Sequence, residues 1–254
     1  MTESESKAKS PFFIGGLSTI GFLNEPKIRI DENGNRTLDV TFLSSLNLIP
    51  VWVKCTHDHL LQAHAAGQRV ADEWKTVDAE RQKELLMTEL APCLQVVITC
   101  GVVIDALYGQ LEPHANISDE TRQQWREKDT PRYSKICHAI GSLYKMNNDV
   151  GKGIRTNLKA VLQLRNDAIH PSSEVKQFAT RPDLPVSVDW WFSAFRYANA
   201  AKCWEATMQI VCFLLGSESK AKRVNEIMKH TFDALFEMKL ISKSEKQEDS
   251  ASVE

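Results

Sequence analysis

The spacing of apolar residues constrains the fold most, because it becomes helical near Val51 and stays so for most of the remaining chain. Apolar residues that recur every three or four positions lie on one face of a helix. The spacing predicts a mainly α-helical protein, with a short surface helix around Trp125 and a last helix that contains Val224 and Phe236. The longer predicted helices cover about 51–74, 80–111, 133–144, 154–169 and 190–215, the last of these ending at Gly216 as C-cap.

Composition places the chain among ordinary globular proteins. Its 254 residues are 43% hydrophobic and 25% charged, which is enough apolar material for a substantial core. Lys and Arg number 31 and Asp and Glu 33, so the net charge is −2 and gives no overall attraction to nucleic acid. A polyanion would therefore have to bind at a local basic patch.

Cysteine use and the N-terminus predict a cytoplasmic protein. The six cysteines are scattered without a Cys-x-x-Cys pair, and the first ten residues lack the basic-then-apolar order of a secretory signal. The apolar run from Leu94 to Leu107 is shorter than the roughly 20 residues of a membrane-spanning helix and contains Asp105. We expect it to be a buried helix and expect no membrane partner.

The chain divides into four parts by composition. Residues 1–12 and 242–254 are polar and are expected to be disordered tails. Residues 13–50 form an N-terminal extension in which apolar residues alternate around Asn33-Gly34, a pattern typical of a β-hairpin. Residues 51–241 form the helical domain.

One position on the helix predicted over 154–169 conflicts with its surroundings. Arg165 lies in the middle of the apolar stripe on that helix, together with Leu158, Leu162 and Ile169. A buried guanidinium is costly unless it meets a carboxylate, a phosphate or an open cleft. Arg165 therefore either makes a structural ion pair or marks a binding site. His170 precedes Pro171 and is predicted to lie at or beyond the helix end.

The segment Arg165-Asn166-Asp167-Ala168-Ile169-His170 resembles the Arg-x4-6-His motif of the HEPN superfamily, in its Arg-Asn-x3-His form. The resemblance covers about residues 80–240. It implies a HEPN-like helical bundle that is usually a homodimer, with two motifs facing each other across a cleft. It also implies a metal-independent endoribonuclease of a defence or toxin system, with RNA as substrate and an antitoxin or defence-system protein as a further partner. Some members of the superfamily only bind RNA or nucleotides.

The chemistry implied by this resemblance suits the residue types. Cleavage of RNA without a metal needs a base for the ribose 2′-OH, an acid for the leaving 5′-oxygen and a cation for the phosphorane. His170 would transfer protons, Arg165 would bind the phosphate, and Asn166 would position the phosphate or the ribose. Asp105, the other charge within an apolar run, is the carboxylate expected to support Arg165, unless it is an ordinary surface residue.

Other sequence features give weaker predictions. Cys55, His57 and His59 would share one side of a strand but diverge in a helix, so we expect no metal site and no cofactor. Gly151-Lys152-Gly153 lacks the full phosphate-loop pattern and is interpreted as a flexible helix start. Two rivals to the ribonuclease remain: a HEPN-like scaffold or binding module without catalysis, and an interaction protein that uses the Trp190–Leu215 helix as its partner surface.

Overall fold

The computed structural model describes residues 17–22, 27–31, 33–39, 42–170 and 177–242, and these ranges contain eight α-helices. The predicted disordered tails, residues 1–12 and 242–254, lie outside the described residues apart from Ser242. The helices are α1 (Ile49–Glu73), α2 (Ala79–Leu111), α3 (Asp119–Glu127), α4 (Arg132–Leu143), α5 (Asn148–Ile169), α6 (Trp190–Ala194), α7 (Tyr197–Gly216) and α8 (Lys222–Glu237), with a 3-10 turn at Glu112–His114. The protein is mainly α-helical, as its periodicity predicts.

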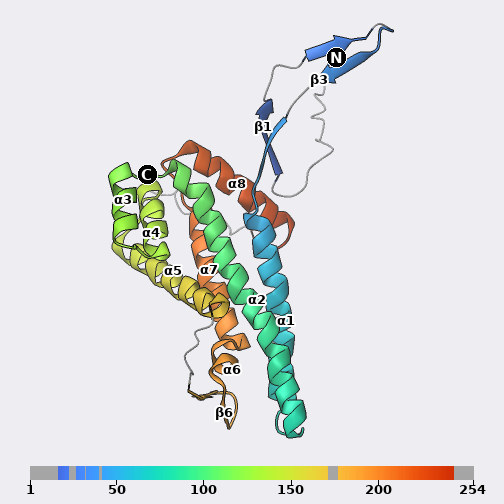
Figure 1. The fold of residues 1–254 in the computed structure, drawn as a ribbon, viewed down its shortest axis with the longest axis vertical. Helices are drawn as coiled ribbons and strands as arrows, with labels where there is room; N and C mark the ends of the chain where they lie inside the picture. The colour runs from blue at the N-terminus through green and yellow to red at the C-terminus, as the bar shows by residue number, and fades with distance from the viewer. Residues whose placement is uncertain (1–16, 23–26, 32, 40–41, 171–176, 243–254) are drawn as a thin grey trace, which may run out of the picture.

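Helix α2 is at the centre of the bundle. It contacts α1 and α7 along its length, and α5 packs across it (Figure 1). Its side chains dominate the core, where Cys93, Val97, Cys100 and Ile104 are almost completely inaccessible to solvent. Helix α4 packs on α5 at one end of the molecule. Helix α5 therefore lies between α4 on one side and α2 and α7 on the other.

Local signals set several helix ends. Asp78 caps α2 by accepting a hydrogen bond from the Arg81 amide, and Ser118 caps α3 in the same way from Thr121. Asn147 caps α5 by accepting from the Val150 amide, so α5 begins at Asn148. Gly151-Lys152-Gly153, interpreted from the sequence as a flexible helix start, lies within the first turns of α5, so the helix begins earlier than predicted.

The prediction of one continuous helix over 190–215 is also wrong, because the chain forms two helices there, α6 and α7. Phe195 ends α6, and Arg196 adopts an extended conformation with φ −95° and ψ 163° before α7 begins. Gly216 is the last residue of α7, and Ser217 is the C-cap. The apolar spacing continues across this break, so the spacing alone does not reveal it.

The described strands are short and form three two-stranded sheets. Strand β1 (Leu17–Phe22) pairs antiparallel with β4 (Phe42–Leu46), and β2 (Lys27–Ile30) pairs antiparallel with β3 (Arg36–Asp39). Gly34, between β2 and β3, has a φ of +79°, a conformation that glycine adopts at little cost. These four strands extend away from the N-terminus of α1 (Figure 1). Strands β5 (Ala179–Thr180) and β6 (Ser187–Val188) pair in the connection before α6.

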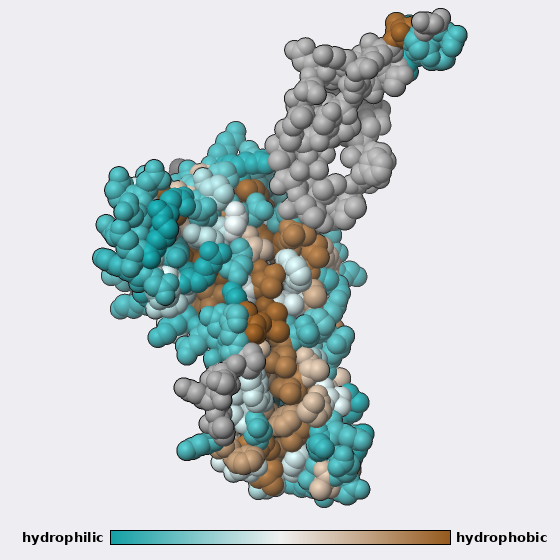
Figure 2. All heavy atoms as spheres, viewed as in Figure 1, coloured by the Kyte–Doolittle hydropathy of each residue, from teal (hydrophilic) through white to brown (hydrophobic). Residues whose placement is uncertain are grey.

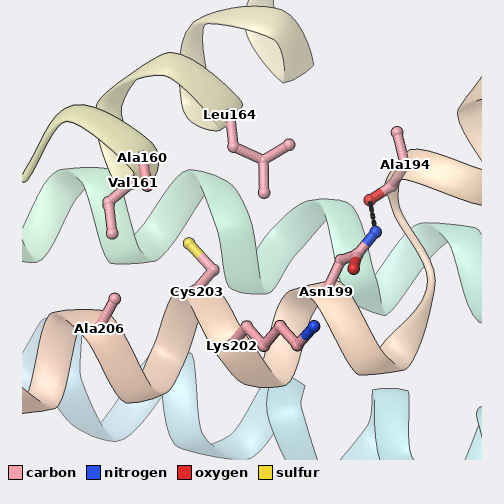
Figure 3. A pocket seen from close by; sticks show the side chains of 8 residues that line it. All are labelled: Ala160, Val161, Leu164, Ala194, Asn199, Lys202, Cys203 and Ala206. Atoms are coloured by element: carbon pink, nitrogen blue, oxygen red, sulfur yellow. Dashed lines mark hydrogen bonds between the residues drawn. The ribbon is translucent and has the colours of Figure 1, made fainter. Parts of the chain in front are cut away.

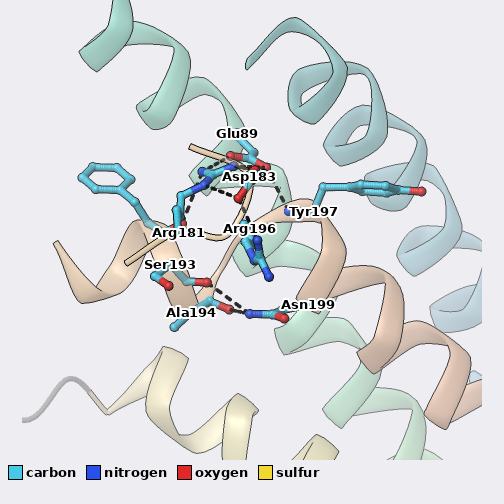
Figure 4. A network of polar contacts seen from close by, with 9 residues as sticks. Glu89, Arg181, Asp183, Ser193, Ala194, Arg196, Tyr197 and Asn199 are labelled. Atoms are coloured by element: carbon cyan, nitrogen blue, oxygen red, sulfur yellow. Dashed lines mark hydrogen bonds and ion pairs between the residues drawn. The ribbon is translucent and has the colours of Figure 1, made fainter. Parts of the chain in front are cut away.

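A buried ionic network fixes that connection to the bundle (Figure 4). Arg181 is 1% exposed and donates from Nη1 to Glu89 Oε2 of α2 at 2.6 Å and from Nη2 to Asp183 Oδ2 at 2.6 Å. Arg196 donates to the other Asp183 oxygen at 2.7 Å, and the Tyr197 amide donates to Glu89 Oε1 at 3.0 Å. Burial alone would raise the pKa of Asp183, but hydrogen bonds and charge from Arg181 and Arg196 lower it to about 2. The break between α6 and α7 thus lies where the chain meets Glu89.

One helical span among the described residues, Ala79–His114, is long and apolar enough to cross a membrane by length and composition. Half of its most apolar window is buried inside the structure. The core helix of a soluble protein has the same length and composition, and the structure is compatible with a soluble protein.

Candidate functional site

Arg165 lies on the last turn but one of α5, where it packs directly on the backbone of α2. A Cβ atom added to Gly101 would lie 2.6 Å from Arg165 Cγ and 2.9 Å from its Nε. Glycine at 101 is therefore what allows α5 to approach α2 this closely. The Arg165 side chain is 20% exposed, so it is covered by α2 but reaches solvent.

The guanidinium of Arg165 is held by Asp105, which lies one helical turn beyond Gly101 on α2. Arg165 Nη2 donates to Asp105 Oδ2 at 2.6 Å. The two charges that interrupt apolar runs in the sequence are therefore partners in the structure. Arg165 Nε is buried and has no hydrogen-bond partner among the described residues, so the guanidinium binds Asp105 through Nη2.

Asp105 has a second arginine partner that the sequence analysis missed. Arg132, the first residue of α4, donates from Nε to Asp105 Oδ1 at 3.0 Å. Its guanidinium also lies over the Tyr108 ring, 4.3 Å from the centroid. Burial raises the pKa of the Tyr108 phenol, so the ring remains neutral at physiological pH. The cluster of Asp105, Arg132 and Arg165 carries one negative and two positive charges, a net charge of +1.

Asn166 and His170 lie at the exposed end of α5. His170 is the C-cap residue, with φ −123° and ψ 71°, and its amide donates to the Asn166 carbonyl at 2.9 Å. Both side chains are exposed, and Ile169 is 38% exposed rather than buried in the stripe. No hydrogen bond or ion pair joins the His170 ring to Arg165 within the described parts of the chain. One copy of the chain thus brings Arg165 and Asp105 together and leaves His170 facing solvent.

The outward face of α2 beside this cluster is apolar. Met87, Ala91, Leu94 and Ile98 follow one another at helical spacing and lead to Gly101 and Asp105 on the same face. Met87 is 53% exposed and Ala91 is exposed, while Leu94 and Ile98 are partly exposed. Figure 2 shows a band of apolar residues that follows the course of α2 in this view.

A groove of about 310 Å³ lies on the other side of α5, against α6 and α7 (Figure 3). Leu164 extends from α5 toward α7, and Cys203 extends from α7 toward α5. The lining of the groove is mostly apolar and consists of Ala160, Val161, Leu164, Ala194, Asn199, Lys202, Cys203 and Ala206. The groove contains none of the residues of the Arg165 cluster.

Among the described residues, no group of three or more His, Cys, Asp or Glu side chains is arranged to hold a metal ion. Cys55, His57 and His59 lie within α1, where their side chains diverge around the helix. No family model, curated protein or solved structure matches the chain. Any functional inference therefore depends on the site itself.

Proposed function

We propose that this protein is a metal-independent endoribonuclease of HEPN type that acts as a homodimer. The observation that carries the proposal is the arrangement at the end of α5. There Asp105 holds the Arg165 guanidinium, which is 20% exposed, and Asn166 and His170 of the same motif are exposed to solvent. In this proposal, residues 51–241 form a HEPN-like bundle and the paired strands before Ile49 form an accessory extension.

The proposed reaction gives a role to Arg165, Asn166 and His170. His170 accepts the proton of the ribose 2′-OH as its oxygen attacks the adjacent phosphorus, and Arg165 neutralises charge that develops on the phosphorane oxygens. The bond between phosphorus and the 5′-oxygen breaks, and the imidazolium formed at His170 returns its proton to that oxygen. The products are a 2′,3′-cyclic phosphate and a 5′-hydroxyl. Asn166 orients the phosphate or the ribose by hydrogen bonding.

In this proposal, the homodimer supplies the approach of His170 to Arg165 that a single chain lacks. Ile169 and the α2 face formed by Met87, Ala91, Leu94 and Ile98 are the apolar surfaces that flank the motif. A second copy placed over them would remove apolar area from water, which favours association. It would also bring His170 of each protomer toward Arg165 of the other, forming a composite cleft.

The rival function is a HEPN-like scaffold or an RNA- or nucleotide-binding protein without catalysis. The observation in its favour is that Arg165 is mostly covered and engaged by Asp105, as expected for an arginine that stabilises helix packing. Both readings place the protein in the cytoplasm, and a defence or toxin role would add an antitoxin or defence-system partner.

Cleavage of RNA that carries or lacks 2′-O-methyl groups separates these functions. We expect the protein to cleave unmodified RNA in EDTA and to leave fully 2′-O-methylated RNA of the same sequence intact, because the attacking hydroxyl is blocked. Cleavage of both RNAs, or activity that EDTA abolishes, would contradict the proposed mechanism. Binding of both RNAs without cleavage of either would support the scaffold instead.

A further inference from the structure

We propose that Arg132 is a second phosphate-binding residue of the Arg165 site, so that RNA is held by two arginines arranged about one carboxylate. This inference rests on the proposed function for its ligand class, RNA. The motif ends at His170 and contains no residue of α4, so the motif gives no role to Arg132.

Positive charge is in excess around Asp105. A single arginine is enough to neutralise a carboxylate, yet Arg132 and Arg165 bind its two oxygens at 3.0 and 2.6 Å. The next carboxylate along the chain, Glu112, is already paired with Arg122. The cluster therefore retains a net charge of +1 at a partly exposed position, which favours an anion.

The single bond from Arg132 to Asp105 leaves the outer end of its guanidinium available. Arg132 bonds Asp105 through Nε, which leaves both Nη groups, and these meet no acceptor among the residues that the structure describes. The pair of Nη groups is the end-on fork that binds two oxygens of a phosphate. Arg132 is 47% exposed, so this fork is open to a ligand.

The Arg132 side chain is also preorganised for binding. The Tyr108 ring lies 4.3 Å from the Arg132 guanidinium and supports one face of it, while Asp105 fixes its Nε edge. A side chain held in place loses less conformational entropy when it binds a ligand than a freely rotating one. Arg223 of α8, which is similarly exposed, has one carboxylate partner and no aromatic support that the structure records.

The test measures binding of single-stranded 2′-O-methyl RNA, which cannot be cleaved, at several salt concentrations. The variants are Arg132→Ala and, as matched control, Arg223→Ala, which also removes one exposed, carboxylate-paired arginine. We expect Arg132→Ala to weaken binding about tenfold, as for loss of a charge-assisted hydrogen bond. It should also reduce the slope of log K against log salt by about 0.7, the value for one phosphate contact on a single strand. Arg223→Ala should change neither quantity.

A second variant, Arg132→Lys, keeps the charge and loses the fork, and we expect it to retain the salt slope with weaker binding. Equal binding by Arg132→Ala and Arg223→Ala would overturn the inference, as would a parent protein that does not bind the RNA. Failure of the proposed function gives a different result. A parent protein that binds RNA through Arg132 but never cleaves unmodified RNA would refute the ribonuclease and support the role of Arg132. A parent protein that cleaves RNA, with RNA binding unchanged by Arg132→Ala, would support the ribonuclease and refute the role of Arg132.

Discussion

Arg165 is the residue on which both the fold and the proposed chemistry depend. The Arg165 side chain fills the space above Gly101 of α2, and its charge is matched by Asp105, which is also on α2. The sequence revealed this arginine because it interrupts an apolar stripe, and Asp105 because it interrupts another. Arg132 gave no such signal, since it interrupts no apolar run and meets Asp105 only through the packing of α4 beside α2.

Substitution of Gly101 tests the closeness of this packing. A Cβ atom at 101 would lie within 3.1 Å of Arg165 Cβ as well as Cγ, so the base of the side chain would have to move. We expect Gly101→Ala to lower the free energy of unfolding by about 1–3 kcal/mol, as for overpacking of a core.

Gly109→Ala is the matched control, because Gly109 lies on the same helix with nothing within 4 Å of its added Cβ. It should raise the free energy of unfolding by about 0.5–1 kcal/mol through helix propensity. Urea denaturation of both variants gives the comparison. Equal effects at the two glycines would contradict the close contact between α2 and Arg165.

At the scale of elements, the sequence predicted the starts of α2 and α3, which local caps set, but it missed the Asn147 cap at the start of α5. The start of α2 was expected at 80 and lies at Ala79, and the Ser118 cap fixed α3. The break between α6 and α7 was not predictable, because its cause is Glu89, which is 108 residues away from Tyr197 in the chain. Neither Arg181 nor Glu89 has a local pattern that identifies it as buried.

The network around Arg181 gives a prediction at this scale. Replacing Arg181 by Met leaves Glu89, which is 2% exposed, without its buried partner. We expect a loss of about 3–5 kcal/mol in the free energy of unfolding, the typical cost of an uncompensated buried charge. The double variant Glu89→Leu with Arg181→Met should lose less than Arg181→Met alone, because no charge is then stranded. Arg223→Met removes a surface ion pair worth less than about 1 kcal/mol and is the control. If Arg181→Met lowered the free energy of unfolding no more than Arg223→Met, the result would contradict a buried ion pair between Arg181 and Glu89.

At the scale of the whole molecule, the fold brings the motif to an apolar surface that the described chain does not cover. The band on α2 and the exposed end of α5 adjoin Asp105 and Arg165. The sequence predicted α2 as a buried core helix, which is correct for one face only. Its opposite face was not recognised as exposed, because an apolar run that continues around a helix does not show which residues meet the neighbouring helices.

The proposed homodimer predicts the effect of a charge on this surface. Ile98→Glu places a carboxylate on the partly exposed face of α2, where it would be desolvated in the dimer and hydrated in the monomer. We expect sedimentation equilibrium to show a dimer for the parent protein and at least tenfold weaker association for Ile98→Glu, with an unchanged helical circular dichroism spectrum. Leu61→Glu on α1, a 55% exposed position, is the control and should remain dimeric. A parent protein that is monomeric at all concentrations would rule out a composite site.

The most direct test of the ribonuclease is to identify the RNA ends formed by the parent and by His170→Ala in EDTA. His170 is exposed at the end of α5, so its replacement should leave folding intact, as thermal unfolding will verify. Mass spectrometry of the fragments should find 2′,3′-cyclic phosphates and 5′-hydroxyls with the parent and uncut RNA with the variant. Intact RNA with a folded, dimeric parent, or equal cleavage by His170→Ala, would contradict the proposed function.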